Sequence, residues 1–267
     1  MKKIACIVFL LSGMLTIAQV SEKELDQVSF VAMDDGQGGM LYGFSMNEKL
    51  IGPNYNIKGD GTKTYNYFSI EGLANGFQMF EVPTTGEMTL LEKKDNQSHG
   101  NAFKMVGSEL AWAQTYKNDV LDKVVEVAFT SNSSNRVNCR GNCINGFGML
   151  QTEGGQMILG YFNKSQPTTP VIHIFKSNSM YQGAMNKWDR EGFGKYTYAN
   201  DGSYYIGMWK KNKREGLGMW FNSDGSLKSK GYYKKDEICN YDSLFMPSIN
   251  HSLYSKLKCS KRVTPVV

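Results

Sequence analysis

Glycine recurs at a nearly fixed spacing through most of this 267-residue chain, and no other sequence feature constrains the fold as strongly. The series is clearest in the C-terminal half, where intervals of 23, 24 and 24 residues separate Gly160, Gly183, Gly207 and Gly231. A second series of Gly-x-Gly pairs begins at residues 146, 192 and 216, with one member missing near residue 169. A period in the low twenties predicts an array of stacked structural units.

Each unit has the length and composition of a β-hairpin, since about 23 residues hold two short strands and two turns. The segments Asn200–Gly202 and Ser223–Gly225 are typical hairpin turns, because glycine adopts a positive φ without strain. Aromatic residues alternate on both sides of these turns. The other glycines, such as Gly192 and Gly194, are expected to lie where neighbouring backbone or aromatic rings come so close that a Cβ would not fit.

Aligning the units brings large side chains into two columns. One column contains Ile158, Tyr181 and Tyr205, and the other contains Phe162, Met185, Trp209 and Tyr233. A single hairpin is barely stable in water, whereas each stacked cross-strand contact adds roughly 0.2–1 kcal/mol. The sequence therefore predicts an all-β, elongated, single-sheet β-hairpin solenoid of about seven or eight units, whose columns replace a conventional interior.

The N-terminal half has a fainter copy of the pattern, in which Gly52, Gly76 and Gly100 are again 24 residues apart. Residues 110–138 are the least repetitive, and their pattern is compatible with a strand pair or with one amphipathic helix. We expect four segments along the chain: a signal peptide at 1–18, degenerate repeats at 19–138, clear repeats at 139–238, and a C-terminal cap or tail at 239–267.

The first 18 residues have the features of a signal peptide. Lys2 and Lys3 precede an apolar run from Ile4 to Leu15, which is short for a membrane span, and small residues precede a cleavage position after Ala18. We therefore expect export to the periplasm or release from the cell. An uncleaved membrane anchor is the alternative.

Removal of this segment leaves four cysteines, Cys139, Cys143, Cys239 and Cys259. An even number of cysteines in an exported chain indicates disulfides, and three pairings are possible. We favour Cys139 with Cys143, because a glycine-containing turn can bring them within bonding distance. A second bond, between Cys239 and Cys259, would pin the tail over the last open strand edge.

The motif Tyr205–Trp209, followed by Glu215–Gly218 and Asp224–Gly225, resembles the MORN repeat, with its Y-x-G-x-W, G-x-G and G signature. Residues 181–202 match it again, and residues 139–161 are similar to the cysteine-bracketed opening repeat of some exported bacterial MORN proteins. The resemblance covers 139–235, whereas residues 40–105 share only the spacing, with Ser69 in place of a glycine. It implies extended, twisted sheets of β-hairpins that scaffold partners, mediate dimers or lie beside membranes, often with proposed lipid binding, and that are not enzymes.

No grouping of residues in the sequence indicates catalysis, a cofactor or a metal centre. His99, His173 and His251 are scattered, and His173 lies in an alternating strand, where a satisfied or solvent-facing imidazole is expected. The segment GDGTKT at 59–64 faintly resembles a phosphate loop, and Asp34 and Asp35 could ligate calcium, but a turn is the preferred interpretation of both. An enzyme with its site within residues 19–138 is kept as a third alternative.

The C-terminal repeats are rich in positive charge. Between residues 176 and 235 there are twelve basic and five acidic residues, a difference of +7. Its densest part, in an inter-hairpin loop, contains Lys210, Lys211, Lys213 and Arg214. These residues could attract an anionic surface such as lipid headgroups. A solubilising edge that keeps exposed strands from pairing is the preferred interpretation.

The sequence thus predicts a non-catalytic, exported repeat protein that presents an interaction surface to an unidentified protein or envelope component. We expect this protein to bind no cofactor and no nucleic acid. The alternative is a peripheral membrane module that binds anionic lipid through its basic C-terminal repeats. Whether two copies form a homodimer is left open by the sequence.

Overall fold

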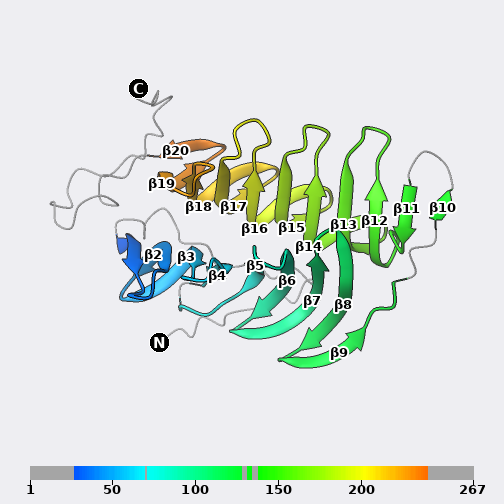
Figure 1. Cartoon of the computed structure of the whole chain (residues 1–267), viewed down its shortest axis with the longest axis horizontal. Coiled ribbons are helices and arrows are strands. Elements are labelled where there is room, and N and C mark those ends of the chain that lie inside the picture. The colour runs from blue at the N-terminus through cyan, green and yellow to red at the C-terminus, as the bar shows by residue number, and fades with distance from the viewer. Residues whose placement is uncertain (1–26, 70, 128–130, 134–137, 240–267) are drawn as a thin grey trace, which may run out of the picture.

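The computed structural model describes residues 27–69, 71–127, 131–133 and 138–239, which form β-strands joined by turns (Figure 1). These residues contain twenty strands in two antiparallel sheets, and within each sheet every strand pairs with the next one along the chain. The all-β prediction is confirmed. The single-sheet prediction is wrong, because the array is divided into two sheets.

The first sheet has nine strands in chain order: β1 (Ser29–Asp34), β2 (Met40–Met46), β3 (Lys49–Ile57), β4 (Lys63–Phe68), β5 (Gly76–Val82), β6 (Glu87–Lys94), β7 (Gln97–Val106), β8 (Glu109–Lys117) and β9 (Val120–Val124). The segment within 110–138 that allowed two interpretations forms a strand pair in its described part, since β8 and β9 join through a tight turn. The helix alternative is therefore wrong for residues 110–124.

The second sheet has eleven strands: β10 (Ser131–Ser133), β11 (Asn138–Gly141), β12 (Gly146–Gln151), β13 (Met157–Asn163), β14 (Gln166–Ile174), β15 (Met180–Asn186), β16 (Asp189–Thr197), β17 (Tyr204–Lys210), β18 (Lys213–Phe221), β19 (Leu227–Lys234) and β20 (Glu237–Cys239). The predicted turns at 200–202 and 223–225 connect β16 to β17 and β18 to β19.

The two sheets pack against each other because the chain doubles back between them (Figure 1). Strands far apart in the sequence therefore become neighbours: β3 lies against β17 and β18, β5 against β15 and β16, and β6 against β14. The shared core contains Phe44, Ile51, Met79 and Phe103 from the first sheet, and Phe147, Phe193, Ile206 and Met219 from the second. A single layer would leave these side chains in water, so a second layer is required.

The two predicted columns form a separate cluster on the opposite face of the second sheet. Ile158, Phe162, Tyr181, Met185, Tyr205, Trp209 and Tyr233 are all buried there, together with Cys143, Leu150 and Val171. Neighbouring residues of one strand point to opposite faces, so Tyr205 packs in this outer cluster and Ile206 in the core between the sheets. The predicted columns are confirmed as one packed cluster, but the protein also has a conventional interior.

Glycine faces glycine across most strands of the second sheet. The register pairs Gly183 with Gly194, and it continues through Gly207, Gly218 and Gly231 to make a row perpendicular to the strands. Rings of Tyr181 and Tyr205 lie over this row, and their hydroxyls donate to the carbonyls of Ala184 (2.7 Å) and Met208 (3.4 Å). A Cβ on Gly194 would lie 2.5 Å from the Tyr181 ring, so the predicted close approach is present at this glycine. At Gly192 the reason is different: its φ of 85° is a backbone conformation that other residues rarely adopt.

Two-residue turns with two positive φ angles recur at one end of the hairpins, the pattern of type I′ turns. They are Asn47–Glu48, Asp95–Asn96, Asn118–Asp119, Lys164–Ser165, Lys187–Trp188, Lys211–Asn212 and Lys235–Asp236. Their intervals are 23 or 24 residues, or 46 and 48, which are two periods. The fainter N-terminal spacing is therefore in step with the C-terminal one.

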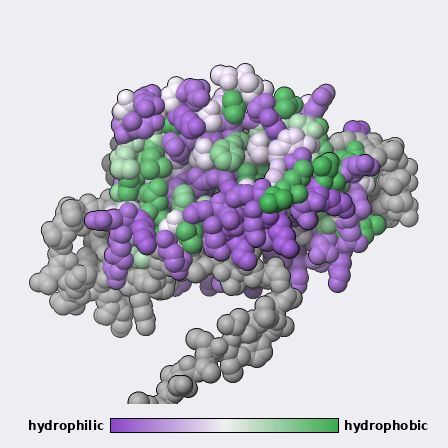
Figure 2. Space-filling model, turned by 90° about the horizontal axis from the view of Figure 1, so that it is seen from below, coloured by the Kyte–Doolittle hydropathy of each residue, from purple (hydrophilic) through white to green (hydrophobic). Residues whose placement is uncertain are grey.

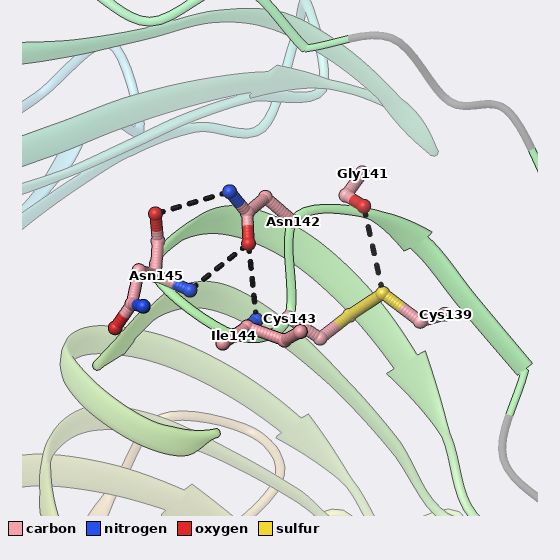
Figure 3. Close-up of a disulfide and its surroundings, with 6 residues drawn as sticks. All are labelled: Cys139, Gly141, Asn142, Cys143, Ile144 and Asn145. Atoms are coloured by element: carbon pink, nitrogen blue, oxygen red, sulfur yellow. Dashed lines mark hydrogen bonds between the residues drawn. A yellow bond between two sulfur atoms is a disulfide. The ribbon is translucent and has the colours of Figure 1, made fainter. Parts of the chain in front are cut away.

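The predicted disulfide between Cys139 and Cys143 is present, with Cα atoms 6.2 Å apart across the loop from β11 to β12 (Figure 3). Within that loop, the Asn142 carboxamide oxygen accepts from the backbone N–H groups of Ile144 (3.1 Å) and Asn145 (2.9 Å). Cys239 is buried at the end of β20. The signal peptide, Cys259 and the cap from residue 240 onward lie outside the described residues.

We expect Gly194→Ala to lower the free energy of unfolding by about 1–3 kcal/mol, because the new methyl group would overlap the Tyr181 ring. Urea denaturation measures the change. Gly154→Ala is the matched control, since its nearest neighbour would be the Thr152 hydroxyl at 3.8 Å and its φ lies outside the left-handed range. Equal stability of the two variants would show that the glycine row is not sterically required.

Candidate interaction surface

Four partly exposed rings lie on the outer face of the second sheet, the face turned away from the first sheet. Phe175 follows β14, Tyr196 belongs to β16, Tyr198 follows β16, and Trp220 belongs to β18. Ring centroids are 5.5 Å apart for Phe175 and Tyr196, 4.7 Å for Tyr196 and Tyr198, and 5.1 Å for Tyr198 and Trp220. We call this group of four rings the aromatic face. It rests on the outer cluster, which fixes it in place.

Two arginines lie over these rings. The Arg190 guanidinium is 4.8 Å from the centroid of Tyr196 and 4.3 Å from that of Trp209. Arg214 is 4.6 Å from Trp220, and the Lys228 ammonium reaches the same ring at 5.0 Å. Each such contact contributes about 0.5–2 kcal/mol, more where water is excluded.

The next turn along the chain holds each arginine side chain in place. Arg190 Nη2 donates to the backbone carbonyl of Asn212 (2.7 Å), and Arg214 Nη2 donates to that of Asp236 (2.8 Å). Arg214 also forms an ion pair with the Asp236 carboxylate at 3.3 Å. The cationic groups of the aromatic face are therefore oriented before any partner arrives.

Hydrogen bonds donated by backbone N–H groups also link each repeat to the next one. The Arg214 N–H donates to Asp236 Oδ1 (2.9 Å), and the Asp236 N–H donates to the Arg214 carbonyl (3.1 Å). The Glu191 and Glu215 carboxylates accept from the N–H groups of Lys211 (3.0 Å) and Lys235 (2.9 Å). Glu191 and Glu215 thus join one repeat to the next, a role that was not predicted from the sequence.

The predicted basic residues divide between two surfaces. Lys210, Lys211 and Lys213 are exposed at the turn between β17 and β18, whereas Arg214 is partly buried against the aromatic face. Lysine also occupies the first position of four turns, at 164, 187, 211 and 235, and all four side chains are exposed. Since two strands separate successive turns, these lysines lie about 10 Å apart along one edge.

The sequence reading also missed two exposed apolar residues on this edge. Trp188 is 43 % exposed and has a φ of 75°, and Ile144 is 61 % exposed in the loop before β12. The Ser165 N–H donates to the Ile144 carbonyl (2.9 Å), so this loop is joined to the next turn. A positive φ is unusual for a bulky side chain. Alignment of the repeats places Trp188 at the same position as Asn212, 24 residues later, and would have shown that Trp188 lies in an exposed turn. We call these residues and the edge lysines the turn edge.

The structure shows where His173, the segment at 59–64 and the aspartates at 34 and 35 lie. His173 is buried, its Nε2 is 2.8 Å from Gln156 Oε1, and burial together with Arg190 lowers its pKa to about 4. Residues 59–62 make the turn between β3 and β4, in which Asp60 accepts from the Thr62 N–H. Asp34 and Asp35 accept backbone N–H groups of the turn before β2. Within the described residues, no three potential ligands gather into a metal site.

A buried ionic cluster joins the sheets. The Lys195 ammonium of β16 lies 2.9 Å from Glu81 Oε1 of β5, and it donates to the Tyr65 hydroxyl of β4 at 3.0 Å. Tyr65 donates to the other Glu81 oxygen at 2.6 Å. Burial opposes the charge on Glu81, but Lys195 and the Tyr65 hydrogen bond outweigh it and hold the pKa of Glu81 below its usual value. Burial lowers the pKa of Lys195.

Seen from below, the side on which the first sheet lies, hydrophilic side chains cover much of the molecule, and hydrophobic ones form smaller patches (Figure 2).

In the described part of the chain there is no helix with the length and apolar character needed to cross a membrane. Models of known protein families give no match to this chain, and a search of curated proteins finds no relative.

Glu92 of β6 provides a test of the packing between the sheets through pH. Its Oε2 accepts the Asn101 N–H at 2.6 Å, and burial raises its pKa from 4.5 to about 7. Because the pKa is raised, the folded protein binds the Glu92 proton more tightly than the unfolded chain does. The contribution of the protonated carboxyl to the free energy of unfolding is therefore complete below pH 4.5 and is lost as pH rises through 7.

We therefore expect the wild type to lose up to about 3 kcal/mol of stability relative to Glu92→Gln between pH 4.5 and pH 8. Urea denaturation of both proteins across this range measures the difference. The ionisation of His173 is common to both proteins and cancels. A difference in stability that does not change with pH would contradict the buried carboxyl.

Proposed function

We propose that this protein is a non-catalytic, exported, MORN-like repeat module whose aromatic face is the docking surface for a protein or envelope component. The observation that carries the proposal is the row of four partly exposed rings with two guanidinium groups fixed over them. Aromatic residues and arginine are enriched in protein interfaces and supply most of the strongest contacts there.

Rigidity supports this assignment. Tyr198 stacks on Trp220 with an angle of 11° between the ring planes, and Arg214 is held between Trp220 and Asp236. Side chains that are already ordered lose little conformational entropy when a partner binds. A partner can therefore gain affinity from a modest area of contact on this face.

Export is supported by two independent features. The N-terminal sequence has the pattern of a signal peptide, and the Cys139–Cys143 disulfide is of a kind that persists in oxidising compartments. We therefore propose that the protein acts in the periplasm or outside the cell.

Exchange of Tyr198 and Trp220 for serine should abolish retention of the partner in a pull-down from the native envelope fraction. Met33→Ser is the matched control, because Met33 is an exposed apolar residue of β1 in the other sheet. The expected result is a band kept by wild type and by Met33→Ser, and lost by the double variant. A band that survives in all three would place the docking surface elsewhere.

A second candidate function is binding to anionic lipid through the turn edge, and the exposed Trp188 and Ile144 among lysines favour it. Tryptophan prefers the boundary between water and lipid. Each lysine near an anionic membrane surface adds roughly 1 kcal/mol of attraction.

Under this candidate, Trp188→Ser and the set Lys210, Lys211 and Lys213→Ser, which leaves the partly buried Arg214 in place, should each weaken pelleting with vesicles rich in anionic lipid. Added salt should weaken wild-type binding, because exposed charges are screened. Lys58→Ser, in the β3–β4 turn, is the control and should pellet as wild type does. Wild-type protein that stays in the supernatant at low salt would exclude lipid binding.

A further inference from the structure

The two-residue turns on either side of the junction between the two sheets keep the spacing of the repeat. Asn118–Asp119 is the last two-residue turn of the first sheet, and Lys164–Ser165 follows 46 residues later, at twice 23. The loop that contains Asn142 lies midway between them. The junction therefore has the length that one straight, uninterrupted array would have.

Strand β9 ends the first sheet with an exposed apolar surface. Val120 is 68 % exposed, Leu121 47 % and Val124 55 %, and β9 pairs only with β8 among the described strands. Open strand edges are normally short, charged or covered, and β9 is short and carries Asp122 and Lys123, but its three apolar side chains are not covered. In a straight array the next repeat would lie beside β9 and would cover these three side chains.

The hydrogen bonds between turns are interrupted at the same place. Asp119 exchanges two hydrogen bonds with Ser98 in the preceding unit, through its N–H (2.9 Å) and its carboxylate (2.7 Å). The next link found in the described residues joins Ser165 to Ile144. The doubled-back chain thus gives up one link of a series that continues on both sides.

The inner faces of the sheets are specific to each other. Tyr161 of β13 donates to the carbonyls of Ala102 (3.0 Å) and Gln114 (2.8 Å), and Lys195 pairs with Glu81. In a straight chain these faces would lie far apart, with their apolar side chains in water. Only a surface with the same residues, a second copy of this chain, satisfies every one of these contacts.

We propose that two copies of this chain exchange sheets, so that each array runs straight and the first sheet of each copy packs on the second sheet of the other. The arrangement is two-fold symmetric and closed, which limits it to a dimer. It keeps the contacts between sheets and adds neighbours for β9. Because the outer face is unaffected, this inference is independent of the proposed docking function.

Charge reversal in the buried cluster tests the exchange. Glu81→Lys alone places two ammonium groups together, and Lys195→Glu alone places two carboxylates together, so each variant should refold poorly. When the two variants are refolded together, exchange gives one interface in which the two substituted side chains face each other with opposite charges, and one interface with the native pair. We expect at least a fivefold higher yield of folded dimer from the mixture than from either variant alone.

The double variant Glu81→Lys/Lys195→Glu is the control, because it restores opposite charges within one chain. If it folds while the mixture yields no more than the separate variants do, exchange is excluded. Light scattering after size-exclusion chromatography measures the mass in each case.

A second measurement uses wild-type protein and does not depend on any variant. Isotopically light and heavy chains are refolded together at high concentration and treated with a carbodiimide, which links Glu81 to Lys195. Exchange predicts light–heavy links in the dimer fraction at about half of the total. A wild type that remains monomeric at millimolar concentration, or links confined to one isotope, would overturn the proposal.

Discussion

The second sheet depends on one steric relation, the contact between tyrosine rings and a row of paired glycines. Tyr181 and Tyr205 occupy the space that the Cβ atoms of Gly194 and Gly218 would need. The glycines must therefore face one another in neighbouring strands, and this fixes the register. A slip of one residue would turn Ile206 toward the outer face and Tyr205 toward the interior. Both faces of the sheet follow from this relation.

The same relation explains why the outer surface is rigid. Once the tyrosine rings lie flat over the glycines, Trp209 packs against both of them, at 5.7 Å from Tyr181 and 5.3 Å from Tyr205. Arg190 then lies on Trp209, and the next turn holds Arg190. Side chains near the surface are thus ordered by successive contacts that begin at the backbone.

Local features of the fold could be read from the sequence, and features that join distant segments could not. The turn at 200–202 and the column of Tyr181 and Tyr205 depend on residues within one or two repeats, which spacing reveals. The second layer was missed although a signal was present. Ile206 and Met219 alternate with Tyr205 and Trp220, so both faces of these strands are apolar, a pattern typical of sheets covered on both sides.

The surface residues divide in the same way. The exposed positions of Lys210, Lys211 and Lys213 follow from their place in a turn, and alignment of the repeats would have revealed Trp188. The partner of Lys195 could not be found by spacing, because Glu81 lies 114 residues earlier in a different sheet. Only the way in which the array doubles back brings the two together.

That ion pair solves a problem that every packed repeat array faces. Two surfaces with the same period could slide past each other by one repeat and still bury most of their apolar side chains. Twenty-four residues after Lys195 stands Met219, and the positions 24 residues on either side of Glu81 are Ile57 and Met105. A slide by one repeat would therefore leave both charges buried against apolar side chains, at a cost of several kcal/mol. The Lys195–Glu81 pair adds little net stability, but it makes one alignment of the two sheets far better than its neighbours.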